Sequence, residues 1–265
     1  MNEQEKLLEL VDLIVHGNQI ALAKAITLVE NDPDLIFKIE AEYGSKLKTI
    51  RSHIIGFTGS PGAGKSTLTD AYVSRLRQEG KKVGIIAVDP SSPFTGGALL
   101  GDRIRMKRHF TDDDVFIRSM GSRGNVGGLT DSIFGVTLLY RLYGFDYIII
   151  ETVGAGQSEI DIVYVADTVV LVLSPGSGDE IQLMKAGIME IADVFVINKS
   201  DMEGADLLKI NLETTLSFSD TKKPIVMCIA TSGKGIEQLH NEIEKHKLYL
   251  NDSGEIYKRE ERRKK

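Results

Sequence analysis

Residues 59–66 combine three glycines, a lysine and a serine in the order Gly-Ser-Pro-Gly-Ala-Gly-Lys-Ser. This order matches a phosphate-binding loop, in which glycines let successive backbone N–H groups point at one anion. The Lys65 ammonium has the reach to contact the outer phosphates of a nucleotide, and the Ser66 hydroxyl can ligate Mg²⁺. An accidental glycine-rich turn is the alternative. The predicted phosphate-binding residues are Gly59, Ser60, Pro61, Gly62, Ala63, Gly64, Lys65, Ser66 and Thr67.

The segment Asn198-Lys199-Ser200-Asp201 has the spacing of a guanine-reading motif, although a polar turn after a strand is the alternative. A carboxylate only accepts hydrogen bonds, and guanine offers two adjacent donors that adenine does not. Asp201 would therefore select guanine, while Asn198 would connect neighbouring loops and the Lys199 stem would lie over the base. Thr231-Ser232-Gly233 resembles a loop that closes over the ring, but alone it fits a strand-to-helix turn equally well. The predicted guanine-binding residues are Asn198, Lys199, Asp201, Thr231, Ser232 and Gly233.

Acidic side chains follow several apolar segments, and carboxylate oxygens suit a hard cation such as Mg²⁺. Glu151-Thr152-Val153-Gly154 stands where most GTPases have Asp-x-x-Gly, and a glutamate there can keep the metal role with a longer reach. Asp89 follows another apolar run. Asp102 follows a glycine-rich loop and also fits the N-cap of a helix at 103–109. We predict Ser66, Asp89, Asp102 and Glu151 as magnesium ligands, and Lys65, Glu151 and Gly154 as the catalytic set.

The elements that must position these residues alternate between strand and helix from residue 52 onward. Several strand candidates are continuous Val/Ile runs, which is typical of parallel strands buried on both faces. Ligands in such sheets sit at the carboxyl ends of the strands, where each motif above is found. The predicted strands are 52–58, 82–88, 114–119, 146–152, 168–173, 193–198 and 224–229. We thus predict an α/β fold of the P-loop NTPase type, a mainly parallel sheet flanked by helices.

Three regions are expected along the chain. Residues 1–48 have helical periodicity and form a small helical appendage, with Asn18 as a helix cap. Residues 49–235 form the nucleotide-binding domain, and residues 236–265 add a helix and a charged tail. The tail at 257–265 is expected to be solvated and partly frayed, with membrane or RNA contact as the alternative.

Composition narrows the classes of function. The net charge of −6 gives no general reason to expect nucleic-acid binding. Cys228 is the only cysteine, so no internal disulfide can form, and its apolar neighbours predict a buried strand position. The sequence contains no Cys-x-x-Cys and no apolar run of membrane-spanning length. Without a signal-type segment, we expect a cytoplasmic protein that contacts neither membrane nor nucleic acid.

With these motifs together, the chain resembles the MeaB/ArgK family of G3E-type P-loop GTPases, named for the glutamate of the third motif. The resemblance covers about residues 50–235. Its matching segments are 59–66, 88–92, 95–103, 151–159, 175–182 and 198–201. Proteins of this family are GTPase chaperones of adenosylcobalamin-dependent methylmalonyl-CoA mutase or related acyl-CoA mutases. They gate cofactor loading and protect the mutase.

The resemblance therefore implies GTP/GDP and Mg²⁺ as ligands, no direct binding of cobalamin, and a mutase partner. An adenosyltransferase is a further candidate partner, and a homodimer is expected, although family members usually carry a longer C-terminal extension that forms it. The resemblance also implies switch loops at 89–105, 152–163 and 175–187. Ion pairs that depend on the bound nucleotide are one interpretation of the acids in the last loop, and a favourable helix N-terminus is the other. The switch residues are Gln157, Asp179, Glu180 and Lys185.

The residue after Gly154 is Ala155, and the nearest glutamine is Gln157. Without a water-positioning glutamine directly after the glycine, we expect slow intrinsic GTP hydrolysis that a partner accelerates. Two alternatives remain. A nickel or cobalt metallochaperone would need soft ligands near the switch loops. A small-molecule kinase would need a second substrate pocket and a base.

Overall fold

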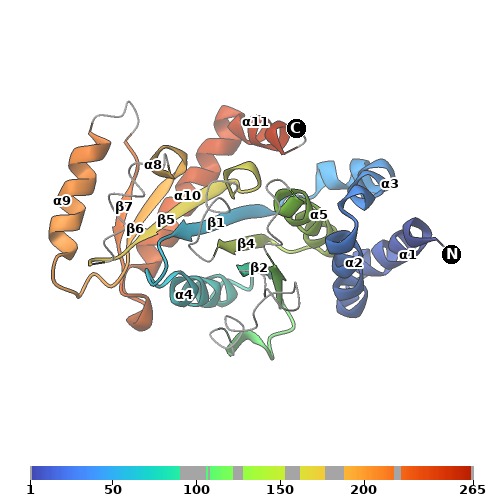
Figure 1. Cartoon of the computed structure of the whole chain (residues 1–265), viewed down its shortest axis with the longest axis horizontal. Helices are drawn as coiled ribbons and strands as arrows, with labels where there is room; N and C mark the ends of the chain where they lie inside the picture. Colours follow the sequence, from blue (N-terminus) through green and yellow to red (C-terminus); the bar gives the residue numbers. More distant parts are fainter. Residues whose placement is uncertain are drawn as a thin grey trace.

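The computed structural model describes residues 2–89, 106, 108–121, 128–152, 162–176, 188–217 and 222–263. Its described part contains one seven-stranded sheet in the order β3-β2-β4-β1-β5-β6-β7, and all strand pairs are parallel (Figure 1). The strands are β1 (His53–Gly59), β2 (Val83–Asp89), β3 (Val115–Gly121), β4 (Tyr147–Thr152), β5 (Thr168–Leu173), β6 (Val194–Ile197) and β7 (Ile225–Met227). The predicted α/β class and parallel sheet are confirmed.

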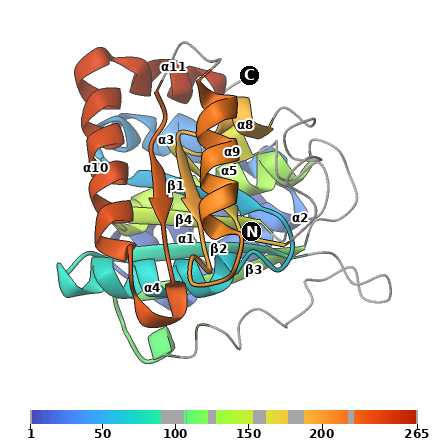
Figure 2. The same ribbon diagram turned by 90° about the vertical axis from the view of Figure 1, so that its left-hand side faces the viewer.

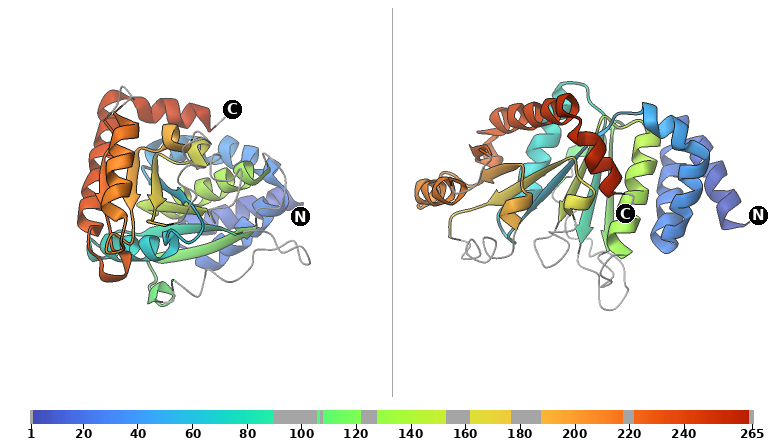
Figure 3. Two further views of the ribbon diagram at one scale, coloured as in Figure 1. Left: turned by 60° about the vertical axis from the view of Figure 1, so that its left-hand side comes forward. Right: turned by 90° about the horizontal axis from the view of Figure 1, so that it is seen from above.

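The central strands are buried on both faces, as their continuous apolar runs predict. Adjacent residues of one strand enter different cores because successive side chains point to opposite faces. In β1, Ile54 joins a core with α5 (Gly128–Tyr143), and Ile55 joins a core with α4 (Lys65–Gln78) and α10 (Ile236–Ser253). Helices thus cover both sides of the sheet, as the views in Figures 2 and 3 show.

A third core lies over β5 and β6, on the face of the sheet that also carries α5. Apolar residues of these strands pack there against α8 (Ile188–Ile191) and α9 (Ala205–Leu216). Short 3₁₀ segments complete the described elements of this domain: η3 (Ile162–Tyr164) before β5, and η4 (Ala230–Ser232) after β7.

The N-terminal helices α1 (Glu3–Val15), α2 (Gln19–Asn31) and α3 (Ile36–Thr49) pack on α5 (Figure 1). A 3₁₀ turn, η1 (Pro33–Leu35), joins α2 to α3. The Asn18 side chain accepts a hydrogen bond from Ala21 N, which confirms the predicted cap. Gly135 of α5 permits the close contact: an added Cβ would lie 2.5 Å from Val29 and 2.8 Å from Ile36. These helices therefore share the core of α5.

The end of the chain differs from the sequence prediction. Residues Glu255–Arg262 form helix α11, which turns away from α10 at Gly254 (φ 74°). Arg259 donates to both carboxylate oxygens of Asp193 at 2.7 and 2.9 Å, and Arg263 pairs with Asp167. The expectation of a solvated, frayed tail is wrong for the described residues up to 263, because two buried or half-buried carboxylates at the starts of β5 and β6 hold it.

Candidate functional site

The loop between β1 and α4 requires glycine at defined positions. Gly59 has φ 136°, and an added Cβ would lie 2.1 Å from the carbonyl oxygen of Val172 in β5. Gly64 has φ 88°, and its Cβ would lie 2.4 Å from Nδ2 of Asn198. L-residues disfavour such positive φ values, and both positions are also sterically closed to a side chain. The backbone conformation and the packing against distant segments therefore both require glycine at positions 59 and 64.

Lys65 begins α4, and its side chain folds back into the loop. Its buried Nζ donates to the carbonyl oxygens of Gly59 at 2.6 Å and Ser60 at 3.0 Å. The N-cap is Gly64, which supplies no side-chain hydrogen bond to the helix, and the first turn carries no acid. The positive end of a 14-residue helix and a lysine therefore lie together at this loop. Such an arrangement can bind an anion.

Ser66 and Glu151 meet beside this loop. Glu151 lies at the end of β4, opposite Phe57 of β1, and is 5% exposed. Its Oε1 accepts a hydrogen bond from the Ser66 hydroxyl. Two of the four predicted magnesium ligands are therefore in contact, and a hydroxyl with a buried carboxylate is a donor set that suits Mg²⁺. The oxygen chemistry of the pair fits the ion that the motifs imply.

Asn198, directly after β6, connects two loops. Its Nδ2 donates to the carbonyl oxygen of Ala63 at 2.9 Å, and its Oδ1 accepts from the backbone N–H of Ala230 at 3.1 Å. Asn198 is 2% exposed, so these bonds form away from solvent. The phosphate loop and the segment after β7 are thereby held at a fixed separation.

Lys199 is the one non-glycine residue with positive φ (55°) in the described part of the chain. This conformation is uncommon for a lysine and is concentrated at functional sites. Its Nζ donates to the carbonyl oxygen of Gly62 at 2.7 Å, so its stem lies toward the phosphate loop. Asp201, two residues on, is exposed and is followed by a turn into α9.

The segment Thr231-Ser232-Gly233 is exposed and ends the η4 turn, with φ 76° at Gly233. It borders a surface hollow of about 620 Å³ that also contacts Thr67, at the end of the predicted phosphate-binding run. Asp70 and Arg108 line the same hollow and form an ion pair, and His109 Nε2 lies 3.2 Å from Asp70 Oδ1. Sequence reasoning missed this contact, because no local motif joins Asp70 to Arg108.

Several predicted site residues cannot be placed. The backbone of Asp89 ends β2, next to β4, but its side chain is outside the described residues. The magnesium candidate Asp102, the catalytic candidate Gly154 and most of the three expected switch loops also lie outside the described residues. The same is true of Gln157, Asp179, Glu180 and Lys185.

Other sequence expectations concern the rest of the molecule. Cys228 is fully buried directly after β7, and burial raises the pKa of its thiol to about 12. Within the described residues, no group of three or more His, Cys, Asp or Glu is arranged to hold a metal ion. No helix in that part of the chain is long and apolar enough to cross a membrane.

Comparison with known proteins gives one family. Residues 22–265 match the model described as "Methylmalonyl Co-A mutase-associated GTPase MeaB". GTPase ArgK of Escherichia coli K12 is 35% identical over 272 residues, which cover 97% of this chain and 80% of that protein. The mouse protein named "Methylmalonic aciduria type A homolog, mitochondrial" is 36% identical over 267 residues, covering 92% of this chain and 63% of that protein.

Solved structures agree with the fold. The crystal structure of an LAO/AO transport system kinase matches with a TM-score of 0.75 and 29% identity, covering all of this chain and 81% of the other. HypB of Helicobacter pylori, solved with nickel, matches with a TM-score of 0.56 and 18% identity over 82% of this chain and 96% of the other. This second likeness concerns the fold alone. The chain belongs to the MeaB family of methylmalonyl-CoA mutase-associated GTPases.

Proposed function

We propose that this GTPase assists and protects an adenosylcobalamin-dependent methylmalonyl-CoA mutase, or a related acyl-CoA mutase, and gates loading of the mutase cofactor. The assignment of the mutase as the partner rests on the family match over residues 22–265, because the family is described by its association with that mutase. The mouse relative is named for methylmalonic aciduria, which concerns the acid of the same acyl group. The cobalamin itself would stay with the mutase and its supplier, of which an adenosyltransferase is a candidate.

The nucleotide would lie across the carboxyl ends of β1, β4 and β6. We assign the phosphates to residues 59–67 and the base to Asn198, Lys199, Asp201 and the segment 231–233. The buried Asn198 bonds support this assignment, since they fix the distance between the phosphate loop and the loop after β7. The hollow beside Thr67 and Ser232 provides open space next to both sets of residues.

Hydrolysis would depend mainly on charge stabilisation. The loop N–H groups, the N-terminus of α4 and the Lys65 ammonium would neutralise charge that develops on the phosphoryl oxygens. Lys65 would exchange its carbonyl partners Gly59 and Ser60 for phosphate oxygens. Bound Mg²⁺ would supply further positive charge, with Ser66 and Glu151 among its ligands and Asp89 and Asp102 as additional candidates. Gly154 and the expected switch loops would change conformation with the presence of the γ-phosphate, and the partner would bind one conformation better than the other.

In this proposal the regions act as three units. The helices at 1–48 extend the core beyond α5, and the domain at 49–235 binds the nucleotide. In the segment at 236–265, α10 covers one face of the sheet and α11 lies at its amino end. A homodimer is part of the proposal. A small-molecule kinase is a second candidate, favoured by the likeness to the structure that is named as an LAO/AO transport system kinase. Phosphate transfer from GTP to arginine would separate it from hydrolysis.

The test is capture of a purified mutase. The immobilised protein is loaded with GDP or with a non-hydrolysable GTP analogue and incubated with methylmalonyl-CoA mutase apoenzyme. We expect retention that differs between the two nucleotides, since a switch must bind its partner differently in its two states. An Asp201→Asn variant, which should bind both guanine nucleotides much more weakly, should lose that difference at nucleotide concentrations that saturate only the wild type. No retention of the mutase in any state would contradict the proposed function.

A further inference from the structure

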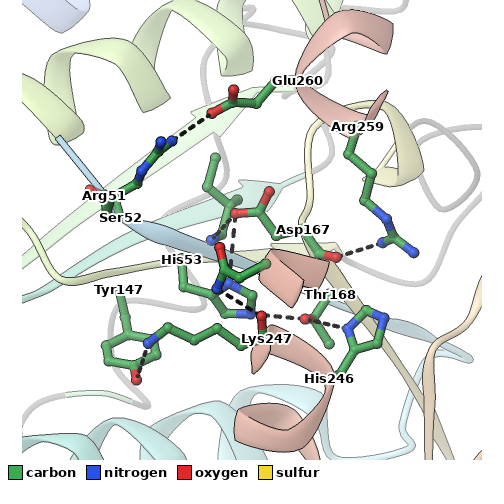
Figure 4. Close-up of polar contacts among 12 residues, drawn as sticks. Arg51, Ser52, His53, Tyr147, Asp167, Thr168, His246, Lys247, Arg259 and Glu260 are labelled. Carbon is green, nitrogen blue, oxygen red and sulfur yellow. Dashed lines mark hydrogen bonds and ion pairs between the residues drawn. The ribbon is translucent and has the colours of Figure 1, made fainter. Parts of the chain in front are cut away.

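A second polar site lies at the amino end of the sheet, opposite to the nucleotide loops. A cavity of about 150 Å³ opens there between the start of β1, α5, α10 and α11. Figure 4 shows part of its lining, with His53 and Asp167 close together, Lys247 extended toward Tyr147, and Arg51 directed at Glu260. His53 begins β1 and Gly59 ends it, so a strand of about 20 Å separates the cavity from the phosphate loop.

The charges that line this cavity do not balance. Arg51, Arg141, Lys247 and Arg263 contribute four cations, against the two carboxylates of Asp167 and Glu260. His53 also lines the cavity, but burial lowers its pKa to about 4, so its ring is neutral near pH 7. The lining therefore carries an excess of about two positive charges at neutral pH, and Glu244, just outside the lining and 3.5 Å from Lys247, offsets one of them.

Both carboxylates have limited capacity to neutralise these cations. Asp167 is buried, and its Oδ2 accepts from the backbone N–H of Ile54 at 2.8 Å while its Oδ1 pairs with Arg263. Glu260 is further away, at 3.8 Å from Arg51 and 3.9 Å from Arg141, and these separations exceed hydrogen-bond distance.

The guanidinium groups of Arg141 and Arg263 have more donors than the described chain has acceptors for them. One terminal nitrogen of Arg141 donates to the carbonyl oxygens of Leu47 at 2.7 Å and Ile50 at 3.1 Å, and one of Arg263 donates to Asp167. The Nε of each is buried and has no hydrogen-bond partner among the described residues. Buried donors without partners are rare, and a bound ion or water is a common reason for them.

We propose that this cavity binds a small oxyanion, with inorganic phosphate as the best-fitting class, between Arg141 of α5 and Arg263 after α11. The guanidinium fork matches the oxygens of phosphate or carboxylate, and the cavity volume is sufficient for one such ion. Lys247 also lines the cavity, but its Nζ donates to Tyr147 Oη at 2.9 Å and lies 3.5 Å from Glu244, so the two arginines carry the site. The bound anion joins α5, the start of β1 and the C-terminal helices, and so strengthens the docking of α11.

The test measures phosphate binding with the nucleotide site already filled. The protein is saturated with a non-hydrolysable GTP analogue and Mg²⁺, so that all phosphate positions of the nucleotide site are occupied, and phosphate is titrated by calorimetry at constant ionic strength. We expect saturable binding of one phosphate, and slower amide exchange in α11 when phosphate is bound. Acetate in a parallel titration distinguishes a general carboxylate site from one that prefers phosphate: equal or tighter acetate binding would overturn the assignment to phosphate.

Variants then locate the site. Arg141→Gln should weaken phosphate binding at least tenfold, and Arg141→Lys, which keeps the charge without the fork, should be intermediate. Lys258→Gln is the matched control, because Lys258 is an exposed cation of α11 that pairs with Glu255 and does not line the cavity. It should leave both the melting temperature and the phosphate affinity unchanged. Absence of saturable binding to the wild-type protein, or equal binding to both glutamine variants, would overturn the proposal.

Discussion

Substitution of Asn198 by alanine tests the connection between the two loops of the nucleotide site. The change removes the donor to Ala63 O at 2.9 Å and the acceptor for Ala230 N at 3.1 Å. Ala63 is fully buried and Ala230 is 7% exposed, so water does not easily replace the lost partners. The variant therefore leaves one backbone carbonyl and one backbone N–H buried without their hydrogen bonds.

Each buried polar group that loses its partner costs about 1–3 kcal/mol. Two such groups give an expected loss of about 2–6 kcal/mol in the free energy of unfolding. For a chain of this size, about 2–4 °C of melting temperature corresponds to 1 kcal/mol. The expected decrease in melting temperature is therefore on the order of 10 °C. GDP affinity should fall as well, because part of the binding free energy must then restore the separation of the two loops.

The assay is thermal unfolding by circular dichroism, followed by GDP titration of the folded variant. Asn211→Ala is the matched control, since Asn211 is exposed on the nearby helix α9. That variant should differ from the wild type by less than about 0.5 kcal/mol. If Asn198→Ala melts within a degree of the wild type and binds GDP equally well, Asn198 does not connect the loops in the way described.

Three further predictions concern the base, the metal and pH. Asp201→Asn should weaken GTP binding by about two orders of magnitude and gain affinity for xanthosine triphosphate, whose base carries a carbonyl in place of the 2-amino group. Substitution of the exposed Asp206 by asparagine should change neither affinity. An unchanged base preference of Asp201→Asn in a nucleotide titration would show that Asp201 does not select guanine. Glu151→Gln keeps a hydrogen-bond acceptor for the Ser66 hydroxyl but removes the negative charge. The Mg²⁺ concentration needed for half-maximal GTP hydrolysis should therefore rise on the order of tenfold. An unchanged Mg²⁺ concentration would argue against Glu151 as a magnesium ligand. Burial lowers the pKa of His53 to about 4, so the unfolded chain takes up a proton near pH 6.5 that the folded chain resists until about pH 4. The contribution of His53 to the free energy of unfolding should be fully present above about pH 6.5 and fall by about 3 kcal/mol on acidification to pH 4. Denaturant titrations at several pH values give the slope of that free energy against pH, and between about pH 4 and 6.5 this slope should be smaller by about one proton in His53→Gln than in the wild type. Equal slopes would refute this role.

The sequence was most informative where local chemistry determines structure. The strand predicted at 168–173 matches β5 in the structure, and the other predicted strands overlap the observed ones with ends that differ by up to two residues. Continuous apolar runs and the glycines of the phosphate loop carry this information, because burial on both faces and positive φ each demand particular residue types.

Contacts between segments far apart in the chain could not be predicted in this way. Arg259 and Arg263 looked like part of a solvated basic tail, but their partners Asp193 and Asp167 lie 66 and 96 residues earlier. The pair of Asp70 and Arg108 is a similar case. A charged residue has the same local pattern whether its partner is water or a distant carboxylate, so only the folded chain distinguishes the two.

The most direct test of the central claim is the rate of GTP hydrolysis with and without methylmalonyl-CoA mutase apoenzyme. If the nucleotide state and mutase binding are coupled, each must affect the other. We predict slow hydrolysis by the isolated protein and a clear acceleration at saturating mutase, with the acceleration lost in Glu151→Gln. A rate that is already near ~10 s⁻¹ without mutase, or one that the mutase does not change, would contradict a GTPase cycle controlled by this partner.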